Sequence, residues 1–333
     1  MTRKTSDRSP VRRGFLVGSF LSVGALAAVL FLPISRRPFV HHTPERVLSY
    51  DEAVKAIESL AANSPSTVRR KCTIQLMAHG QPTERVFVLL HGLSNCPAQF
   101  EKLGRRLFER GHNVLIPRLP YHGEEDRLTT EWGALTAEEM LDSGNQAADL
   151  ARSLGREVVV AGLSINGAVV AWMAQNRADV HKSVLLAPFL APAGVPPWAL
   201  APLERVLLRL PNMFFWWDAS LREDLKGPSY AYPRFPTRVV AETILLSRSV
   251  VEESRILPAR CPSILTVTTA YDTAADNLVA EELVANWRNL RPVGVETFEF
   301  PAEKRVPHDF IDPNQPNQRV ELVYPTIIEL LEN

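Results

Sequence analysis

The sequence has no excess of charge of either sign. Lys and Arg together number 37, Asp and Glu together also number 37, and the formal net charge at pH 7 is +0. A chain without a net basic field lacks the general electrostatic attraction that draws proteins to nucleic acids. We therefore expect no nucleic-acid partner.

Cysteine is scarce, and its three positions show no C-x-x-C spacing: Cys72, Cys96 and Cys261. This pattern excludes a disulfide-dense scaffold and a zinc knuckle, and it allows at most one disulfide. We interpret the three residues as buried thiols. The adjacent pair His41 and His42 has no further ligands at metal-binding spacing, so we interpret it as a solvated pair.

Residues 14–34 contain no charged side chain, and their sequence is GFLVGSFLSVGALAAVLFLPI. About 20 helical residues, each rising roughly 1.5 Å, span a bilayer core of roughly 30 Å. The preceding segment, residues 1–13, is a basic n-region, which predicts that the N-terminus stays on the cytoplasmic side. We therefore expect an uncleaved membrane anchor, with the remaining chain on the extracytoplasmic (periplasmic) side.

A second interpretation of the same segment is an export signal that is later removed. The run RRGFL at residues 12–16 resembles a twin-arginine signal, which directs folded proteins across the membrane. A cleavable signal should end in a polar region with small residues around the cut. The candidate at residues 25–27, Ala-Leu-Ala, is followed by more apolar residues, which favours the anchor.

The rest of the chain alternates short apolar runs with helical stretches, after a polar connector at residues 35–69. Such alternation predicts an α/β fold with a mainly parallel sheet flanked by helices. Thr136 and Glu139 form a capping-box pattern at the start of one of these helices. Between 190 and 259 the alternation gives way to proline and aromatic residues, so we expect an inserted cap (lid) there and a core at 70–189 and 260–333. The expected strands are 72–77, 85–90, 113–117, 157–161, 183–187, 263–268 and 295–300.

The strand at 157–161 leads into the sequence GLSING, which places Ser164 between Gly162 and Asn166. A nucleophile elbow needs small residues two positions before and two after its serine, because the strand and the helix crowd each other there. Gly162 meets this requirement. Asn166 is larger than the usual glycine, which leaves two alternatives open: a serine in an ordinary turn, or an elbow impaired by crowding.

Three further features lie just beyond the C-terminal ends of expected strands. His-Gly at 91–92 leads to Leu93, whose backbone N–H can face a developing oxyanion together with the N–H of Ile165. Asp272 follows the strand at 263–268, and His308 follows the last strand. The chain order Ser, Asp, His at the carboxyl edge of a parallel sheet is typical of one large class of hydrolytic site.

Two of these assignments have rivals in the sequence. Asp276 lies four residues after Asp272 but falls where the next helix should begin, which favours a helix-capping role. His308 competes with other histidines, of which two lie in loops near the expected site. The competing histidines are His79, His91, His112, His122 and His181.

Taken together, the chain resembles a serine α/β-hydrolase and is most similar to bacterial carboxylesterases and monoacylglycerol lipases. The resemblance runs from about residue 69 to the end of the chain, interrupted by the cap. Its motifs are the His-Gly at 91–92, NVLIPRLPYHG at 113–123, GLSING, AYD at 270–272 and PHDF at 307–310. The third of these has Asn166, and the second has Tyr121, where the family pattern has glycine.

The resemblance implies a role for each candidate. Ser164 would attack an ester carbonyl, His308 would act as general base and then general acid, and Asp272 would orient His308. It implies a small-molecule ester substrate and neither a metal nor an organic cofactor. The same triad would also serve a thioesterase or a peptidase. A further alternative is a catalytically silent domain that binds a partner or a lipid at the membrane.

Aromatic residues in the expected cap suggest the substrate. An apolar pocket suits lipid-derived or medium-chain acyl esters, and a cap over the site can supply one. The candidate contacts are Phe214, Phe215, Trp216 and Trp217. These residues could instead form the core of the cap, or they could enter the membrane interface, where Trp is enriched.

Overall fold

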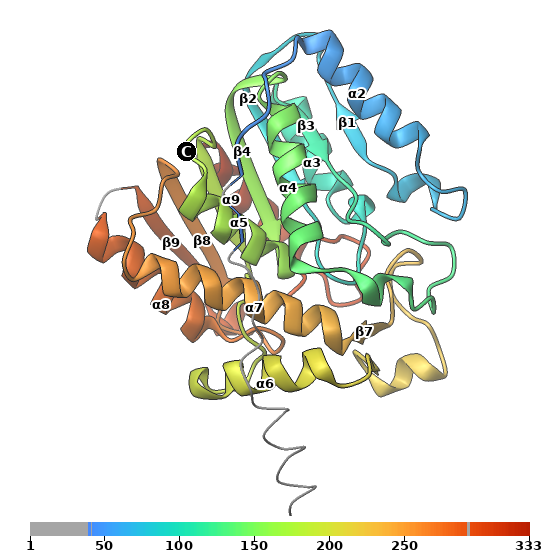
Figure 1. Cartoon of the computed structure of the whole chain (residues 1–333). Helices are drawn as coiled ribbons and strands as arrows, with labels where there is room; N and C mark the ends of the chain where they lie inside the picture. The colour runs from blue at the N-terminus through green and yellow to red at the C-terminus, as the bar shows by residue number, and fades with distance from the viewer. Residues whose placement is uncertain (1–38, 41, 292–293) are drawn as a thin grey trace, which may run out of the picture.

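A seven-stranded sheet forms the centre of the computed structural model, which describes residues 39–40, 42–291 and 294–333 (Figure 1). The spatial order is β1-β3-β2-β4-β5-β8-β9, with β1 antiparallel to β3 and the other neighbours parallel. All seven expected strands are present, which confirms the predicted mainly parallel sheet. Their bounds are β1 Gln75–Met77, β2 Thr83–Leu90, β3 Asn113–Ile116, β4 Gly155–Leu163, β5 Lys182–Leu186, β8 Ser263–Thr269 and β9 Val295–Phe300.

The apolar strands are buried on both faces. In β2, Val86, Val88 and Leu90 belong to one hydrophobic cluster, whereas Phe87 and Leu89 belong to the other. Successive side chains of a strand point to opposite faces, so an uninterrupted apolar run requires a cover on each side. Because these strands carry apolar side chains on both faces, helices have to cover both faces of the sheet, which gives a three-layer architecture.

Helices form the two outer layers (Figure 1). The first face is covered by α2 (Tyr50–Ala62), α4 (Ala137–Ala151), α5 (Ile165–Asn176), α7 (Thr237–Ser254) and α8 (Asn277–Leu290). The second is covered by α3 (Glu101–Glu109) and α9 (Val320–Glu332). The predicted capping box is confirmed, since Thr136 and Glu139 bond reciprocally at the start of α4. Every residue of α5 is buried, as expected for the helix that follows a nucleophile elbow.

The segment expected to form a cap contains a helix and a small hairpin. Helix α6 (Pro197–Arg209) packs on α7, and β6 (Phe214–Trp216) pairs antiparallel with β7 (Arg234–Pro236). Pro233 directly precedes β7 and Pro236 is its last residue, and the hairpin is limited to three residue pairs. The boundaries 190–259 stay a prediction.

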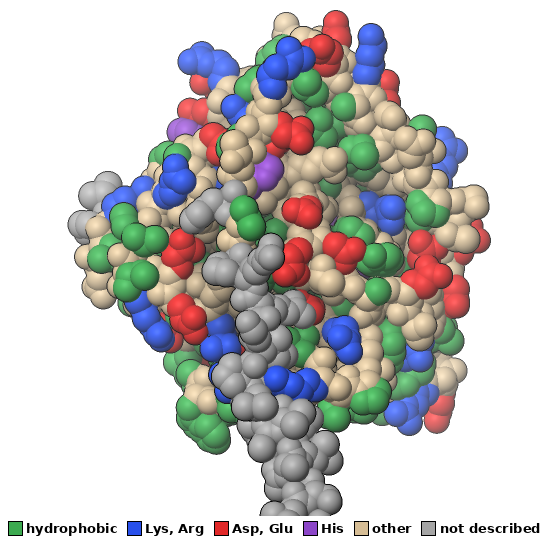
Figure 2. Space-filling view, viewed as in Figure 1, with side chains coloured by type: hydrophobic (Ala, Val, Ile, Leu, Met, Phe, Trp, Pro, Cys, Tyr) green, Lys and Arg blue, Asp and Glu red, His purple; other side chains and the backbone are tan. Residues whose placement is uncertain are grey.

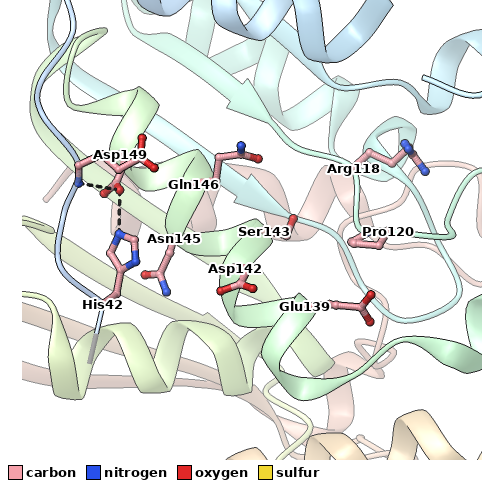
Figure 3. Close-up of a pocket in the computed structure, with 10 residues that line it drawn as sticks. His42, Arg118, Pro120, Glu139, Asp142, Ser143, Asn145, Gln146 and Asp149 are labelled. Atoms are coloured by element: carbon pink, nitrogen blue, oxygen red, sulfur yellow. Dashed lines mark hydrogen bonds and ion pairs between the residues drawn. The ribbon is translucent and has the colours of Figure 1, made fainter. Parts of the chain in front are cut away.

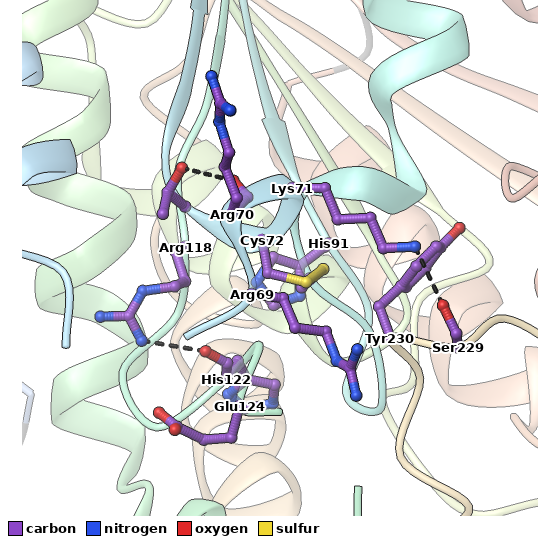
Figure 4. Close-up of a disulfide and its surroundings, with 12 residues drawn as sticks. Arg69, Arg70, Lys71, Cys72, His91, Arg118, His122, Glu124, Ser229 and Tyr230 are labelled. Atoms are coloured by element: carbon purple, nitrogen blue, oxygen red, sulfur yellow. Dashed lines mark hydrogen bonds between the residues drawn. A yellow bond between two sulfur atoms is a disulfide. The ribbon is translucent and has the colours of Figure 1, made fainter. Parts of the chain in front are cut away.

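Cys72 and Cys96 form a disulfide, so the expectation of three buried thiols was wrong for two of them. The bond joins the end of one short 3₁₀ helix, η1 (Arg70–Cys72), to the residue that precedes another, η2 (Pro97–Gln99), and Tyr230 from the cap segment packs beside it (Figure 4). Cys261 is a buried free thiol. The sequence could not reveal the pairing, because it depends on a long-range contact between η1 and η2.

The predicted n-region at 1–13 and the predicted anchor at 14–34 lie outside the described residues. Within the described part of the chain, none of the helices combines the length and the apolar character that a bilayer span requires. His42 corrects another expectation: its Nε2 lies 2.7 Å from the Asp149 carboxylate and its side chain is 23% exposed, so it is not simply solvated. This contact attaches the predicted connector to α4.

Candidate active site

Ser164 occupies a strained turn between β4 and α5. Its φ is 60° and its ψ is −120°, a region that residues with a Cβ rarely adopt and that costs of order 1–3 kcal/mol. The turn is held on both sides, because the Ser164 N–H donates to the Leu186 carbonyl at 3.0 Å and the Phe189 N–H donates to the Ser164 carbonyl at 2.9 Å. At Gly162, an added Cβ would collide with the Asn166 backbone, so only glycine fits. The local geometry is that of a nucleophile elbow.

Asn166 does not distort this turn. Its side chain is 1% exposed and points toward the end of β2, where its Nδ2 donates to the His91 carbonyl at 2.5 Å. The larger residue therefore occupies space beside the oxyanion loop, and Gly167 packs against Pro188. The crowding that the sequence suggested is avoided by the direction of the amide.

Ser164, His308 and Asp272 form a continuous chain of hydrogen bonds. The distance from Ser164 Oγ to His308 Nε2 is 2.9 Å, and that from His308 Nδ1 to Asp272 Oδ2 is 2.7 Å. The other carboxylate oxygen accepts from the backbone N–H groups of Ala274 and Ala275. Burial would raise the pKa of Asp272, but the His308 contact and these two N–H groups outweigh it and lower the pKa. Asp272 therefore stays ionised and fixes the orientation of the imidazole ring.

The rival residues hold other positions. Asp276 is the N-cap of α8, and its carboxylate accepts from the Leu278 N–H at 2.9 Å. His91 accepts the Leu119 N–H on Nε2, so its Nδ1–H donates to the Gly92 carbonyl. His122 lies between two backbone carbonyls, those of Leu93 and Pro120.

Burial keeps both of these histidines neutral. It lowers the pKa of His91 to about 3, with a further contribution from His122, and it lowers the pKa of His122 to about 4. A neutral imidazole that bonds only backbone is suited to hold a loop and not to exchange protons with a substrate near pH 7. Among the three histidines at this edge of the sheet, His308 alone contacts Ser164.

Two backbone N–H groups beside Ser164 remain available. The N–H groups of Leu93 and Ile165 donate to no acceptor among the described residues, and both residues line the same cavity as Ser164. Ile165 is the first residue of α5, so its N–H also lies at the positive end of the helix dipole. The two N–H groups match the pair of donors that an oxyanion requires.

The cavity above Ser164 measures about 800 Å³ and has an apolar side and a polar side. Of the four aromatic residues predicted to contact substrate, Trp217 lines it. Phe214, Phe215 and Trp216 belong to the β6 strand and are not part of the lining. The apolar side also includes Phe189, Leu221, Phe235 and Val240.

Asp309 organises the polar side, which the sequence did not identify. Its Oδ2 accepts from Asn95 Nδ2 at 3.1 Å, from Gln99 Nε2 at 2.9 Å and from Gln315 Nε2 at 2.8 Å. Asp309 directly follows His308, so this network joins the histidine loop to the loop that carries Leu93. The only signal that the sequence offered for this role was a charged residue directly after His308.

A second cavity, of about 520 Å³, lies beside α4 and away from Ser164. Acidic side chains gather over α4 on this face (Figure 2). His42 and Asp149 face each other at one end, while Asp142 and Glu139 lie farther along the helix (Figure 3). The described residues contain no cluster of three or more side chains able to hold a metal ion.

Comparison with known proteins identifies the family. A family model described as "Alpha/beta hydrolase family" matches residues 87–318. No curated protein sequence matches the chain significantly.

Several solved structures share the fold. A monoacylglycerol lipase from Paleococcus ferrophilus is 19% identical over 78% of this chain and 97% of its own, with a TM-score of 0.60. A structure reported with LipS and LipT, two metagenome-derived lipolytic enzymes, is 17% identical over 80% and 99%, with a TM-score of 0.57. A soluble variant of the Saccharomyces cerevisiae monoglyceride lipase is 12% identical over 78% and 90%, with a TM-score of 0.54. At these identities the likeness establishes the fold alone.

Proposed function

Because this chain belongs to the alpha/beta hydrolase family, we propose that it is a serine hydrolase that cleaves carboxylic esters through an acyl-enzyme intermediate. The observation that carries the proposal is the hydrogen-bonded series of Asp272, His308 and Ser164, with Ser164 on a strained elbow. A serine in an ordinary turn would need neither the strain nor the aligned imidazole. The lipases among the similar structures are compatible with this chemistry but do not establish it.

In the acylation step, Ser164 Oγ attacks the ester carbonyl carbon while His308 Nε2 takes the hydroxyl proton. The carbonyl oxygen becomes an oxyanion, which the N–H groups of Leu93 and Ile165 stabilise. The C–O bond to the alcohol then breaks. The alcohol leaves with the proton from His308, and the acyl group stays on Ser164. Asp272 keeps His308 in the tautomer that both proton transfers require.

In the deacylation step, water replaces the alcohol. His308 removes a proton from the water, the resulting hydroxide attacks the acyl carbon, and the same two N–H groups stabilise the second oxyanion. The carboxylic acid is released and Ser164 regains its proton from His308. The cycle consumes one water and needs no other reactant.

The proposal can be tested with p-nitrophenyl esters of short to long acyl chains and with a fluorophosphonate probe. We expect the full-length protein to hydrolyse at least one ester and to bind the probe covalently, and Ser164→Ala to do neither. Ser143→Ala is a matched control, because Ser143 lies on α4 beside the second cavity. A wild-type protein that neither hydrolyses esters nor takes up the probe would favour the catalytically silent alternative.

We also propose that the acyl group is of medium length or lipid-derived. The support is the apolar side of the cavity, where Trp217, Phe235 and Val240 can cover a hydrocarbon chain. Trp217→Ala should reduce kcat/KM for the longer esters by about tenfold, because about 1.4 kcal/mol of apolar contact is lost, and should leave the shortest esters unchanged. An equal loss for all chain lengths would contradict this assignment.

The location of the protein is a separate proposal: the catalytic domain faces the extracytoplasmic side, anchored through residues 14–34. The Cys72–Cys96 disulfide supports it, because structural disulfides persist in oxidising compartments. Protease added to spheroplasts should digest the domain, whereas a cytoplasmic domain would stay protected until the membrane is broken. A mature N-terminus beyond residue 34 would favour the twin-arginine alternative with cleavage.

A further inference from the structure

We propose that Asn166 and Gln99 are positioning residues that hold the peptide between His91 and Gly92, and through it the N–H of Leu93, in the orientation that binds the oxyanion. The inference rests on the proposed serine-hydrolase function. It assigns a task to the residue at which this chain departs from the usual elbow pattern.

The two amides hold opposite ends of one peptide group. Asn166 Nδ2 donates to the His91 carbonyl at 2.5 Å, and the N–H of Gly92 donates to Gln99 Oε1 at 2.8 Å. The carbonyl of His91 and the N–H of Gly92 belong to the same rigid plane. Rotation of this plane would break at least one of the two bonds, so its orientation is fixed from both sides.

The neighbouring groups leave one donor free. The Gly92 carbonyl accepts from the Asn95 N–H at 3.2 Å and from His91 Nδ1 at 3.0 Å, while the Leu93 carbonyl accepts from His122 Nε2 at 2.6 Å. Every polar backbone group between the His91 carbonyl and the Leu93 carbonyl therefore has a partner among the described residues, except the N–H of Leu93. The hydrogen bonds of the loop leave this donor unused in a residue that lines the cavity.

Because Gly92 is a glycine, the backbone of this loop needs external hydrogen bonds to hold one conformation. A Cβ at this position would lie 3.6 Å from the Cβ of Ser164, which is ordinary van der Waals contact, so steric exclusion does not require a glycine here. A glycine backbone has more accessible conformations than any other residue, and the loop would sample several of them without external bonds. The Asn166 and Gln99 amides remove that freedom at the residue that precedes the oxyanion donor.

Both amides are buried, and one of them is incompletely satisfied. Asn166 and Gln99 are each 1% exposed, where hydrogen bonds are not weakened by water. The Oδ1 atom of Asn166 is buried and has no hydrogen-bond partner among the described residues. An unpaired buried acceptor destabilises a fold. Stability alone does not account for this asparagine, whereas a contribution to the oxyanion hole does.

Gln99 also connects the oxyanion loop to the catalytic histidine loop. Its Nε2 donates to Asp309 Oδ2 at 2.9 Å, and Asp309 directly follows His308. One side chain thus contacts both the Gly92 N–H and the histidine loop. A shift of one loop is therefore transmitted to the other, so the Leu93 N–H and His308 keep their positions relative to Ser164.

The decisive comparison is between the full-length wild type and Asn166→Gly, which restores the usual elbow pattern. We expect kcat for a p-nitrophenyl ester to fall by about 10- to 100-fold with little change in KM, because a misplaced donor weakens only the transition state. A trifluoromethyl ketone forms a tetrahedral oxyanion on the serine, and its affinity should fall by the same factor. Gln99→Met, which removes the acceptor for the Gly92 N–H, should behave in the same way and provides a second test if the first variant does not fold.

Asn176→Ala is the matched control. Asn176 is the last residue of the same helix α5, at the end opposite Asn166; it is buried, and its Nδ2 donates to the Trp172 carbonyl and to the Glu253 carboxylate. It should lower the melting temperature and leave kcat and the ketone affinity unchanged, which separates positioning from general destabilisation.

Two outcomes would overturn the proposal. Asn166→Gly or Gln99→Met with wild-type kcat and wild-type ketone affinity would show that the peptide needs no such clamp. A parallel loss in Asn176→Ala would show that the effect is one of stability. A wild type without hydrolysis dependent on Ser164 would instead refute the proposed function, so the two failures are distinguishable.

Discussion

Two histidine–carboxylate pairs of the same length lie in different parts of the molecule. His308 and Asp272 are 2.7 Å apart at the carboxyl edge of the sheet, and His42 and Asp149 are 2.7 Å apart beside α4. The histidines are 20% and 23% exposed, and both carboxylates are almost fully buried. Neither the length of a pair nor its burial therefore shows whether the pair takes part in chemistry.

The partners of each pair make the difference. The second ring nitrogen of His308 meets Ser164 Oγ, whereas Asp149 meets the Arg177 guanidinium at 2.6 Å and also the Glu45 N–H. In the first pair the remaining contact is a serine hydroxyl, beside two backbone N–H groups that have no acceptor within the described part of the chain. In the second pair it is a permanent cation. A histidine–carboxylate pair is therefore recognised as a candidate active site by the further group that contacts the pair and by nearby backbone N–H groups that have no acceptor.

Replacing the two histidines should give the largest contrast. We expect His308→Gln to reduce kcat/KM for ester hydrolysis by about 10⁴-fold or more, because no base remains to take the Ser164 proton. His42→Gln should retain full activity. Steady-state kinetics on both variants test this contrast, and a comparable loss in His42→Gln would mean that the second pair takes part in the chemistry.

Replacing the two carboxylates should separate activity from stability. Asp272→Asn should reduce kcat by roughly 10⁴-fold, because the amide no longer fixes the tautomer of His308. Asp149→Asn should leave kcat unchanged and lower the free energy of unfolding by about 3 kcal/mol, because the buried Arg177 keeps, among the described residues, only Asp179 as a carboxylate partner. Urea titrations alongside the kinetics distinguish the two effects. Equal kinetic defects in both variants would break the comparison.

A third class of histidine is buried and contacts only backbone groups, and it should make the free energy of unfolding depend on pH. The folded-state pKa values of His91 and His122 are lowered to about 3 and about 4, chiefly by burial, while an unfolded histidine titrates near 6.5. As the pH falls below about 6.5, the unfolded chain takes up protons that the folded chain cannot. The free energy of unfolding should therefore decrease, by about 2 kcal/mol for each residue at pH 5.

Urea unfolding between pH 7 and pH 5 measures this decrease. In His122→Asn one of the two buried histidines is removed, so the free energy of unfolding should fall less steeply with decreasing pH than in the wild type, by the contribution of one histidine. A slope identical to that of the wild type would show that His122 does not stay neutral in the folded protein.

The smallest effect is expected at Asp276, the rival of Asp272. Asp276→Ala removes an N-cap bond to the Leu278 N–H and should lower the free energy of unfolding by about 1 kcal/mol. Activity should not change. A loss of kcat resembling that of Asp272→Asn would reopen the choice between the two residues.

The parts of the molecule that could be predicted are those with a local signal. Apolar runs revealed the seven strands, and the positions of Ser164, Asp272 and His308 after three of them placed the residues at one edge. Parallel strands bring their carboxyl ends together, so local patterns were sufficient to bring distant residues into one site.

The parts that could not be predicted depend on contacts between segments that carry no such pattern. The Cys72–Cys96 bond joins η1 to the residue that precedes η2, and the His42–Asp149 contact joins the connector to α4. Asn166 was identified as a departure from the elbow pattern, but its bond to the His91 carbonyl depends on the direction of a side chain, which periodicity does not encode.

The position of β9 at the edge of the sheet has a consequence for how the protein responds to heat. β9 pairs with β8 on one side only, and the segment that carries His308 follows it. Edge strands open at lower free energy than central ones, and such local opening needs no unfolding of the core. Amide hydrogens of β9 should therefore exchange faster than those of β4, and ester hydrolysis should be lost on warming before the cooperative transition of the fold begins.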